Sequence, residues 1–185
     1  MRTIPDISDL LVPLDEAIDT YFIPALTGRD SISNPERQLL ALPARLGGLS
    51  LVVPSQSASF EHSSSVKVTA PLAALIVQQN PILTATTSAD QQQAKQEVRL
   101  LCHQQQTTTA KQLEHELPRH LKRAKELGSE KGASSWLSAL QIEEHGFVLH
   151  KGCFRDTLCL RYGWQPTNAR NRCTCGSPFS VEHAL

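Results

Sequence analysis

SADQQQAKQEVRLLCHQQQTTTAKQLEHEL, residues 88–117, decides the fold class of this chain. Its apolar stripe starts with Ala94, Val98 and Leu101, and these spacings of four and three residues place the side chains on one face of a helix. Glutamines and β-branched threonines at 104–109 lower the helix propensity and predict a weak middle. We therefore expect a long, polar, partly exposed helical arm that lacks the sustained heptads of a coiled coil.

Shorter helices are predicted upstream of this arm. A first helix is expected to end near Gly28, and Asn34 and Thr69 are the expected caps of two further helices, each with a proline in its first turn. The glycine pair at 47–48 predicts a tight turn, after which 49–53 form a short strand or an extended segment. The predicted inner face of the first helix consists of Leu14, Ile18, Tyr21, Phe22 and Ala25.

Composition divides the chain into four predicted parts. "GSEKGASS" is rich in glycine and serine, which is typical of a linker, and beyond it two short helices are expected, the second ending at Gly163. The expected fold class is mostly α, with several helices, a long polar helical arm and a small C-terminal subdomain that ends in a partial zinc knuckle. The predicted parts are a helical connector over 1–87, the arm over 88–127, the linker over 128–135 and the C-terminal helical subdomain over 136–185.

Overall composition limits the class of protein. Of the 185 residues, 40% are hydrophobic and 5% aromatic, so we expect a thin, aliphatic core. The formal net charge is zero, but residues 1–30 are mainly acidic and residues 151–172 are mainly basic. This distribution is compatible with nucleic-acid contact by the basic C-terminal region only. The start lacks the apolar stretch of a signal peptide, and the longest apolar run, 72–77, is too short to cross a bilayer. We expect an intracellular protein, cytoplasmic or nuclear, without a membrane partner and with cysteines as free thiols or metal ligands.

The last residues, "RCTCGSPFSVEHAL" (172–185), carry three zinc-type ligands. Cys173 and Cys175 can bind one metal ion through a tight turn that Gly176 favours, and His183 returns to it after a short excursion. A structural zinc site usually closes with four ligands, so the expected cofactor is a zinc ion whose fourth ligand the chain lacks. The alternative interpretation is two unrelated cysteines and a surface histidine.

A nucleic-acid surface is predicted around the last helix. Lys151 and Arg155, four residues apart, share one face of this helix, where their charges can contact phosphates. Aromatic side chains beside arginines can stack on nucleobases. The alternative is that these aromatic residues form the core of the small subdomain. The predicted phosphate contacts are Lys151, Arg155, Arg170 and Arg172, and the predicted stacking platforms are Tyr162 and Trp164.

Three stretches together resemble one family. "LLALPARLGGLSL" (39–51), "SSWLSALQIEEHGFVLHKGCFRDTLCLRYGW" (134–164) and "CTCGSPFSVEHAL" (173–185) are similar to the region downstream of the polymerase domain in reverse transcriptases of non-LTR (LINE-type) retrotransposons. The resemblance implies a thumb-like or connector region followed by a Cys-Cys-His-Cys zinc knuckle. In that family a cysteine five positions after the histidine completes the knuckle, which here corresponds to a position beyond Leu185.

Motifs for catalysis do not occur in the sequence. The polymerase of that family needs a paired Asp-Asp to hold two metal ions, and this sequence has no such pair. It also has no Walker loop, Gly-x-Gly-x-x-Gly loop, His-Glu-x-x-His helix or Gly-x-Ser-x-Gly elbow. We therefore expect no enzymatic activity and no small-molecule substrate. The predicted function is that of a nucleic-acid-binding remnant of such a reverse transcriptase, with RNA or DNA as its partner. The alternative is a helical structural or protein-interaction module that pairs with another helix through 88–127.

Overall fold

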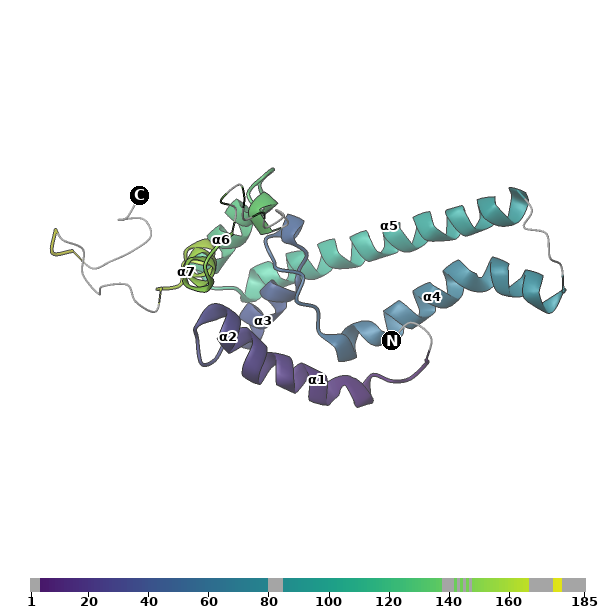
Figure 1. Ribbon diagram of the computed structural model, residues 1–185, viewed down its shortest axis with the longest axis horizontal. Helices are drawn as coiled ribbons and strands as arrows, with labels where there is room; N and C mark the ends of the chain where they lie inside the picture. Colours follow the sequence, from purple (N-terminus) through teal and green to yellow (C-terminus); the bar gives the residue numbers. More distant parts are fainter. Residues whose placement is uncertain are drawn as a thin grey trace. The chain divides into compact units, whose positions relative to one another are not determined.

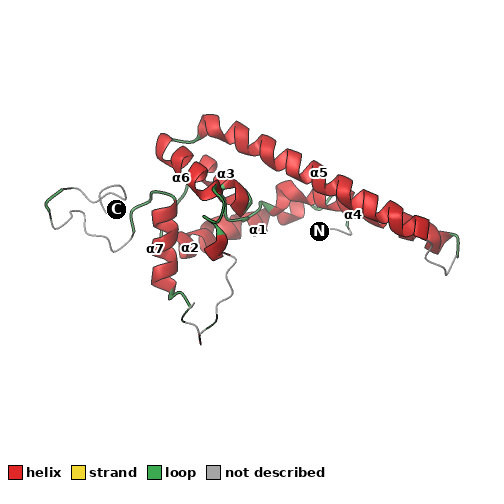
Figure 2. Cartoon of the chain, turned by 90° about the horizontal axis from the view of Figure 1, so that it is seen from above, coloured by secondary structure: helices red, strands yellow, loops and turns green. Residues whose placement is uncertain are grey.

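The structure is a computed structural model that describes residues 4–79, 85–137, 142, 144, 146, 148–166 and 175–177. Helices make up most of these residues and none of them lies in a strand, which confirms the expected mostly α class (Figure 1 and Figure 2). The elements in chain order are a 3-10 turn at Asp9–Leu11, α1 (Val12–Ala17), a π-helical turn at Ile18–Phe22, α2 (Ile23–Thr27), α3 (Asn34–Ala41), a 3-10 turn at Ala44–Leu46, α4 (Pro54–Val77), α5 (Ala85–Glu116), α6 (Arg119–Ser129), a 3-10 turn at Ser135–Leu137 and α7 (Lys151–Arg161).

The chain forms two compact units, each built from two separate stretches of sequence. Unit 1 comprises Met1–Glu16 and Val52–Thr109, and unit 2 comprises Ala17–Leu51 and Ala110–Leu185. The parts predicted from composition are continuous segments of sequence and do not coincide with these units. The predicted connector over 1–87 contributes to both units, and the arm after it is divided between them. Packing between distant segments, which composition does not report, sets the units.

Unit 1 contains a pair of long helices, α4 and the part of α5 up to Thr109. They lie side by side in Figure 1, and Lys67 Nζ lies 2.6 Å from Glu97 Oε2 across the pair. At the start of α4, the Ser55 N–H donates to an oxygen of Asp15, in α1, at 3.2 Å. This bond satisfies one of the main-chain donors that the first turn of a helix leaves free.

The predicted start of the helix around residue 70 is wrong. α4 begins at Pro54 and continues through Pro71, which therefore lies inside the helix and not in its first turn. Thr69 does not act as a cap, because its Oγ1 donates to the Ser65 carbonyl at 2.8 Å within the same helix. Pro71 has no main-chain N–H to donate, and the hydrogen bonds of the neighbouring turns keep the helix continuous there.

The predicted weak middle of the arm is also wrong. α5 is continuous over Ala85–Glu116, including 104–109. Thr107 Oγ1 donates to the His103 carbonyl at 2.8 Å, so this hydroxyl is satisfied without leaving helical geometry. Helix propensity determines secondary structure only weakly, and tertiary context can override it. The arm is instead interrupted at Pro118, which precedes α6.

A π-helical turn changes the first predicted helix. Residues Ile18–Phe22 have π geometry, which adds residues to the turn and rotates everything after it relative to an α-helix. Ile23 is therefore fully buried, whereas Tyr21 is 74% exposed. The predicted inner face, which included Tyr21 and Phe22, is wrong for this reason. The helix ends where it was predicted to end, at Gly28, whose φ is +73°.

A capping box starts α3. Ser33 Oγ accepts from the Glu36 N–H at 3.4 Å, while the Ser33 N–H donates to the Glu36 carboxylate at 2.7 Å. This reciprocal pair satisfies two free donors at the start of the helix. Asn34, the predicted cap, is the first helical residue instead, because the glutamate three positions after Ser33 favours the serine.

The glycine turn after α3 is confirmed. Gly47 has a φ of +86°, and a Cβ at this position would lie 2.6 Å from the Lys125 carbonyl oxygen, so only glycine fits. The segment after the turn is not a strand, and Ser50 within it has a left-handed φ of +59°, so the segment is an irregular loop. It is held by the N–H groups of Leu49 and Leu51, which both donate to the Leu40 carbonyl, at 3.1 and 3.0 Å.

Unit 2 holds the hydrophobic core. Its buried side chains come from α2, α3, the last turns of α5, α6 and α7, together with the residues that directly follow α3, α5 and α7. Segments far apart in the sequence therefore share one interior. The core residues are Ile23, Leu39, Leu40, Leu42, Ala110, Leu113, Leu117, Leu121, Ala124, Leu158, Cys159, Tyr162 and Trp164.

The segment predicted as a linker, 128–135, packs within unit 2. Gly128 is a buried residue of α6, and the Ser134 hydroxyl lies 2.8 Å from the Gly128 carbonyl and 3.0 Å from the Ala44 carbonyl. Of the short helix predicted next, the structure describes one 3-10 turn, and 138–141 lie outside the described residues. Among the described residues, no helix has the length and apolar character needed to span a membrane.

Candidate nucleic-acid interface

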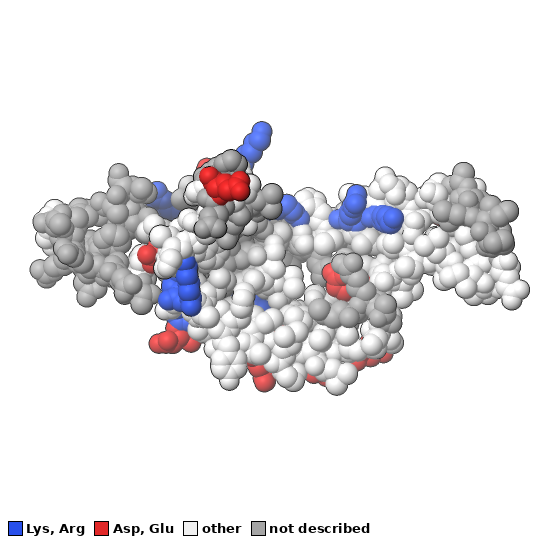
Figure 3. All heavy atoms as spheres, viewed as in Figure 1, with Lys and Arg blue, Asp and Glu red and all other residues white. Residues whose placement is uncertain are grey.

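Charged side chains are dispersed over the face drawn in Figure 3. In Figure 3, Lys and Arg side chains occur at separate places among acidic and uncharged ones, and the coloured part of this face shows no continuous basic stripe. On this face, contact with phosphates would therefore depend on individual side chains.

The two predicted phosphate contacts on α7 differ in exposure and in hydrogen bonding. Lys151 is exposed in the first turn of the helix. Arg155 is partly buried, and its Nη2 donates to the Ala25 carbonyl, near the end of α2, at 2.9 Å. That bond uses part of the guanidinium for holding α2 and α7 together. Arg170 and Arg172 lie outside the described residues.

Tyr162 and Trp164 are placed in the core, which corrects the prediction that they are stacking platforms. Tyr162 is fully buried and Trp164 is 5% exposed, so neither ring offers a face to a nucleobase. Their ring centroids lie 4.8 Å apart. The Tyr162 hydroxyl donates to the Gly47 carbonyl at 3.1 Å, and burial raises the pKa of Tyr162 to about 12. The alternative interpretation, that the aromatic residues form the core, is the one these positions support.

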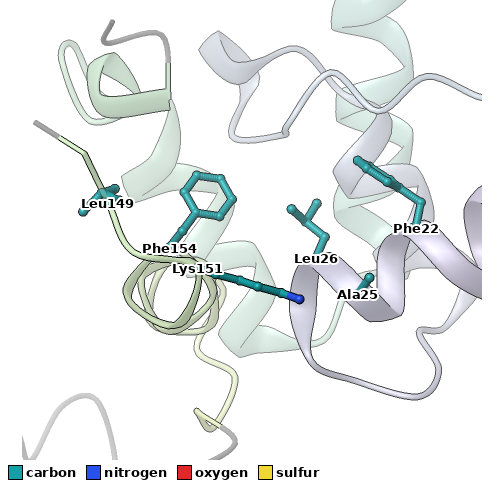
Figure 4. Close-up of a pocket in the computed structure, with 6 residues that line it drawn as sticks. All are labelled: Phe22, Ala25, Leu26, Leu149, Lys151 and Phe154. Atoms are coloured by element: carbon teal, nitrogen blue, oxygen red, sulfur yellow. The ribbon is translucent and has the colours of Figure 1, made fainter. Parts of the chain in front are cut away.

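An open hollow lies between α2 and α7, with a volume of about 400 Å³. Figure 4 shows side chains from both helices around it, with the Lys151 side chain extending across it toward α2. We name it the α2–α7 hollow. Its lining residues are Phe22, Ala25, Leu26, Leu149, Lys151 and Phe154.

The hollow combines aromatic surface with one positive charge. Phe22, whose ring is turned outward after the π-helical turn, is 50% exposed. Phe154 is partly buried, and its ring makes an edge contact with Trp136 at a centroid distance of 5.7 Å, which fixes its orientation. Lys151 is the charged lining residue, and no acidic side chain is found among the described residues that line the hollow. Such a surface suits a flat, apolar ligand that carries a negative charge.

Phe22 and Leu26 were not predicted as site residues. Phe22 lies on the predicted inner face of a regular helix, and only the π-helical turn moves it outward. A π-helical turn has no reliable sequence signal, so this placement could not be derived from spacing. Phe154 lies on the helix that was predicted around Lys151 and Arg155, but the packing of α2 against that helix was not predicted.

The predicted zinc ligands lie mostly outside the described residues, which include Cys175 but neither Cys173 nor His183. Cys175 is exposed, and Gly176 after it has a φ of +88°, the left-handed conformation that the predicted tight turn requires. The described residues contain no cluster of three metal-binding side chains. The zinc site therefore stays a prediction, with which the geometry at Cys175 and Gly176 is compatible.

Comparisons of the chain with protein-family models, with curated protein sequences and with solved structures gave no match.

Proposed function

We propose that this chain is a nucleic-acid-binding remnant of a non-LTR retroelement reverse transcriptase, and that unit 2 binds single-stranded RNA or DNA in the α2–α7 hollow. The observation that carries the proposal is that exposed Lys151 lines the same hollow as two phenylalanine side chains, Phe22 and Phe154. Single-stranded nucleic acids bind to surfaces that pair aromatic platforms with positive charge. The resemblance of 134–164 to that family supports the same proposal.

The roles of the side chains follow from their exposure. Lys151 contacts a phosphate, and the half-exposed ring of Phe22 stacks on a base. Arg155 holds α2 against α7, and of its guanidinium groups only those other than the bonded Nη2 and the buried Nε are proposed to contact a phosphate. Arg170 and Arg172 are proposed as further phosphate contacts on the basis of the sequence alone.

A zinc ion is part of the proposal. Cys173, Cys175 and His183 would hold it, and its role is to order the chain around the last basic residues. The polymerase and nuclease sites of the parent enzyme are not part of the proposed function.

The test compares two adjacent aromatic residues. Phe22→Ala should weaken binding of a fluorescently labelled single-stranded oligonucleotide by about 1–3 kcal/mol, which is roughly five- to 150-fold in Kd, because a stacking platform is lost. Tyr21→Ala is the matched control: Tyr21 is 74% exposed but does not line the hollow, so affinity should be unchanged. Fluorescence anisotropy measures both, and circular dichroism checks that each variant is folded.

Salt dependence provides a second readout. Affinity for the oligonucleotide should fall steeply between about 50 and about 200 mM salt, and Lys151→Ala should reduce the slope of log K against log salt by about 0.7. Lys131→Ala, an exposed lysine elsewhere in unit 2, is the control for loss of charge. Binding that is flat in salt, or equal losses for Phe22→Ala and Tyr21→Ala, would contradict the proposal.

A further inference from the structure

The densest run of positive charge in the chain lies in α6 and has no part in the proposed function. Four of the 18 lysine and arginine residues fall within residues 119–125, and this stretch contains no aspartate or glutamate. Like charges that are neighbours on a helix repel one another, so such a run needs an explanation in the fold or in a ligand. The four residues are Arg119, Lys122, Arg123 and Lys125.

Packing divides these four charges between two faces of the helix. The buried residues of α6 recur at helical spacings and form one inner face: Leu121, Ala124, Lys125 and Gly128. Lys125 is 7% exposed, and its Nζ pairs with the Glu114 carboxylate. Arg119, Lys122 and Arg123 lie on the opposite, outer face, where the two arginines are exposed and the lysine is half-buried. The lysine that faces the core is therefore paired within unit 2, and three positive charges remain on the outer face of α6.

Helix stability does not account for the outer charges. A positive charge near the start of a helix opposes the helix dipole, which favours acidic residues there. α6 has Arg119 as its first residue and no acidic residue in its first turn. Among the described residues, neither Arg119 nor Lys122 has an acidic partner, whereas Arg29 pairs with Glu36. A negatively charged ligand would provide the neutralisation that the fold does not.

The outer face of α6 is held on a rigid support. At the C-terminal end of the helix, Arg161 Nη2 donates to the Gly128 carbonyl at 3.3 Å and to the Ser134 hydroxyl at 2.8 Å. Nearer its start, the fully buried Leu121 side chain fixes the helix to the core. Binding groups on a helix that is held in this way need less ordering when a ligand binds than groups on a loop.

The composition of the outer face favours one kind of anion. α6 contains no phenylalanine, tyrosine or tryptophan, so it offers no ring for the base stacking on which single-strand binding depends. Helices that bind membranes insert apolar side chains, but most of the apolar residues of α6 are buried, and the exposed Leu127 lies near its end. A nucleic-acid double helix encloses its bases and carries one phosphate charge per about 1.7 Å of its axis. It therefore suits a surface that offers charges alone.

We propose that the outer face of α6 binds the phosphate backbone of a nucleic-acid double helix through Arg119, Lys122 and Arg123, without regard to base sequence. This activity goes beyond the proposed binding of a single strand in the α2–α7 hollow and does not rest on it. Glu126 lies on the same outer face and opposes the contact, because its carboxylate repels phosphates.

The test is the binding of a fluorescently labelled, blunt-ended DNA duplex of mixed sequence by the full chain, measured by anisotropy between about 50 and about 200 mM salt. Three phosphate contacts predict a slope of log K against log salt of about −2.7, at about 0.9 per contact. Arg119→Gln and Lys122→Gln should each make this slope shallower by about 0.9, because one contact is lost. Glu126→Gln should instead tighten binding, since a repulsive charge is removed.

Arg99→Gln is the matched control, because Arg99 is an exposed arginine of α5 in unit 1 and its loss should leave the slope unchanged. Glutamine is a good helix former, and circular dichroism checks that each variant is folded. A slope that Arg119→Gln and Lys122→Gln leave unchanged, or that Arg99→Gln reduces equally, would overturn the proposal. Tighter binding to vesicles of anionic lipid than to the duplex, at the same salt concentration, would also overturn it.

Phe22→Ala separates this proposal from the proposed function. Phe22 lines the α2–α7 hollow and is not part of α6, so this variant should bind the duplex as the wild type does. If Phe22→Ala leaves single-strand binding unchanged while Arg119→Gln weakens duplex binding, the assignment of the hollow fails and that of α6 stands. The reverse pattern of losses would overturn the assignment of α6 and leave that of the hollow intact.

Discussion

Glu36 joins three segments of unit 2 through one carboxylate. Its Oε1 accepts from the Trp164 indole N–H at 3.1 Å and from Arg29 at 2.6 Å, while its Oε2 accepts from the Ser33 N–H at 2.7 Å. The Arg29 guanidinium also lies 4.6 Å from the centre of the Trp164 ring. These contacts explain why Trp164 is unavailable to a nucleobase, since one face and the ring nitrogen are already used by the protein.

The pKa of Glu36 links this network to pH. Burial raises the pKa, but the hydrogen bonds from Ser33 and Arg29 outweigh it, so the pKa lies below the ordinary value of 4.5. A carboxyl whose pKa is lowered by folding stabilises the fold above the pKa of the unfolded chain, and this contribution is lost as the pH falls through the folded value. The network should therefore weaken in acid and not in alkali.

Glu36→Gln should lower the free energy of unfolding near neutral pH by about 1.5–3 kcal/mol, because hydrogen bonds to a charged group are lost. The difference between variant and wild type should shrink as the pH falls below the ordinary value of 4.5 and then through the lower pKa of the folded chain, where the wild-type carboxylate becomes protonated. Urea unfolding at several pH values measures this. Glu126→Gln, at an exposed position of α6, is the control and should change little. A difference that stays constant down to low pH would contradict the assignment.

At the scale of elements, local sequence signals found most helices but misplaced several boundaries. Gly28 and Gly163 were correctly predicted as helix ends, since their conformations, at φ of +73° and +66°, favour glycine in any context. Proline was less informative. It is favoured in the first turn of a helix but also tolerated inside a long one, and sequence alone could not decide which applies to Pro71.

Pro71→Ala distinguishes the two positions. Inside α4, an alanine restores a main-chain N–H for the carbonyl four residues earlier, and proline in a helix interior costs up to about 3 kcal/mol relative to alanine. The thermal midpoint of the helical circular dichroism signal should therefore rise. Pro54→Ala is the control, because Pro54 lies in the first turn of α4, where proline is well tolerated. If Pro71→Ala has no more effect than Pro54→Ala, the helix does not run through residue 71.

At the scale of the whole molecule, the mostly α class could be predicted from the sequence, whereas the assembly of the core could not. Helical periodicity is a local property, but the core of unit 2 joins residues as distant as Gly47 and Tyr162, whose hydrogen bond spans 115 positions. The candidate site shows the same limit. Lys151 was found from its charge, while Phe22 depends on a π-helical turn and on the packing of α2 against α7.

Because the helices of unit 2 share one core, we expect a core mutation to reduce the protection of their backbone amides from hydrogen exchange in all of them together. Leu158 of α7 is fully buried, and Leu158→Ala should lower the free energy of unfolding by about 2–5 kcal/mol. Hydrogen exchange measured by mass spectrometry should accelerate in α3, α6 and α7 alike, because they enclose the same side chains. Exchange in α4, which belongs to unit 1, should change much less.

The control is Leu160→Ala on the same helix, where the side chain is 43% exposed and its removal leaves no buried cavity. Exchange in all helices should then remain close to that of the wild type. If Leu158→Ala accelerates exchange in α7 alone, then α7 is attached to the rest of unit 2 only loosely. If α4 accelerates as much as α6, the two units unfold as one.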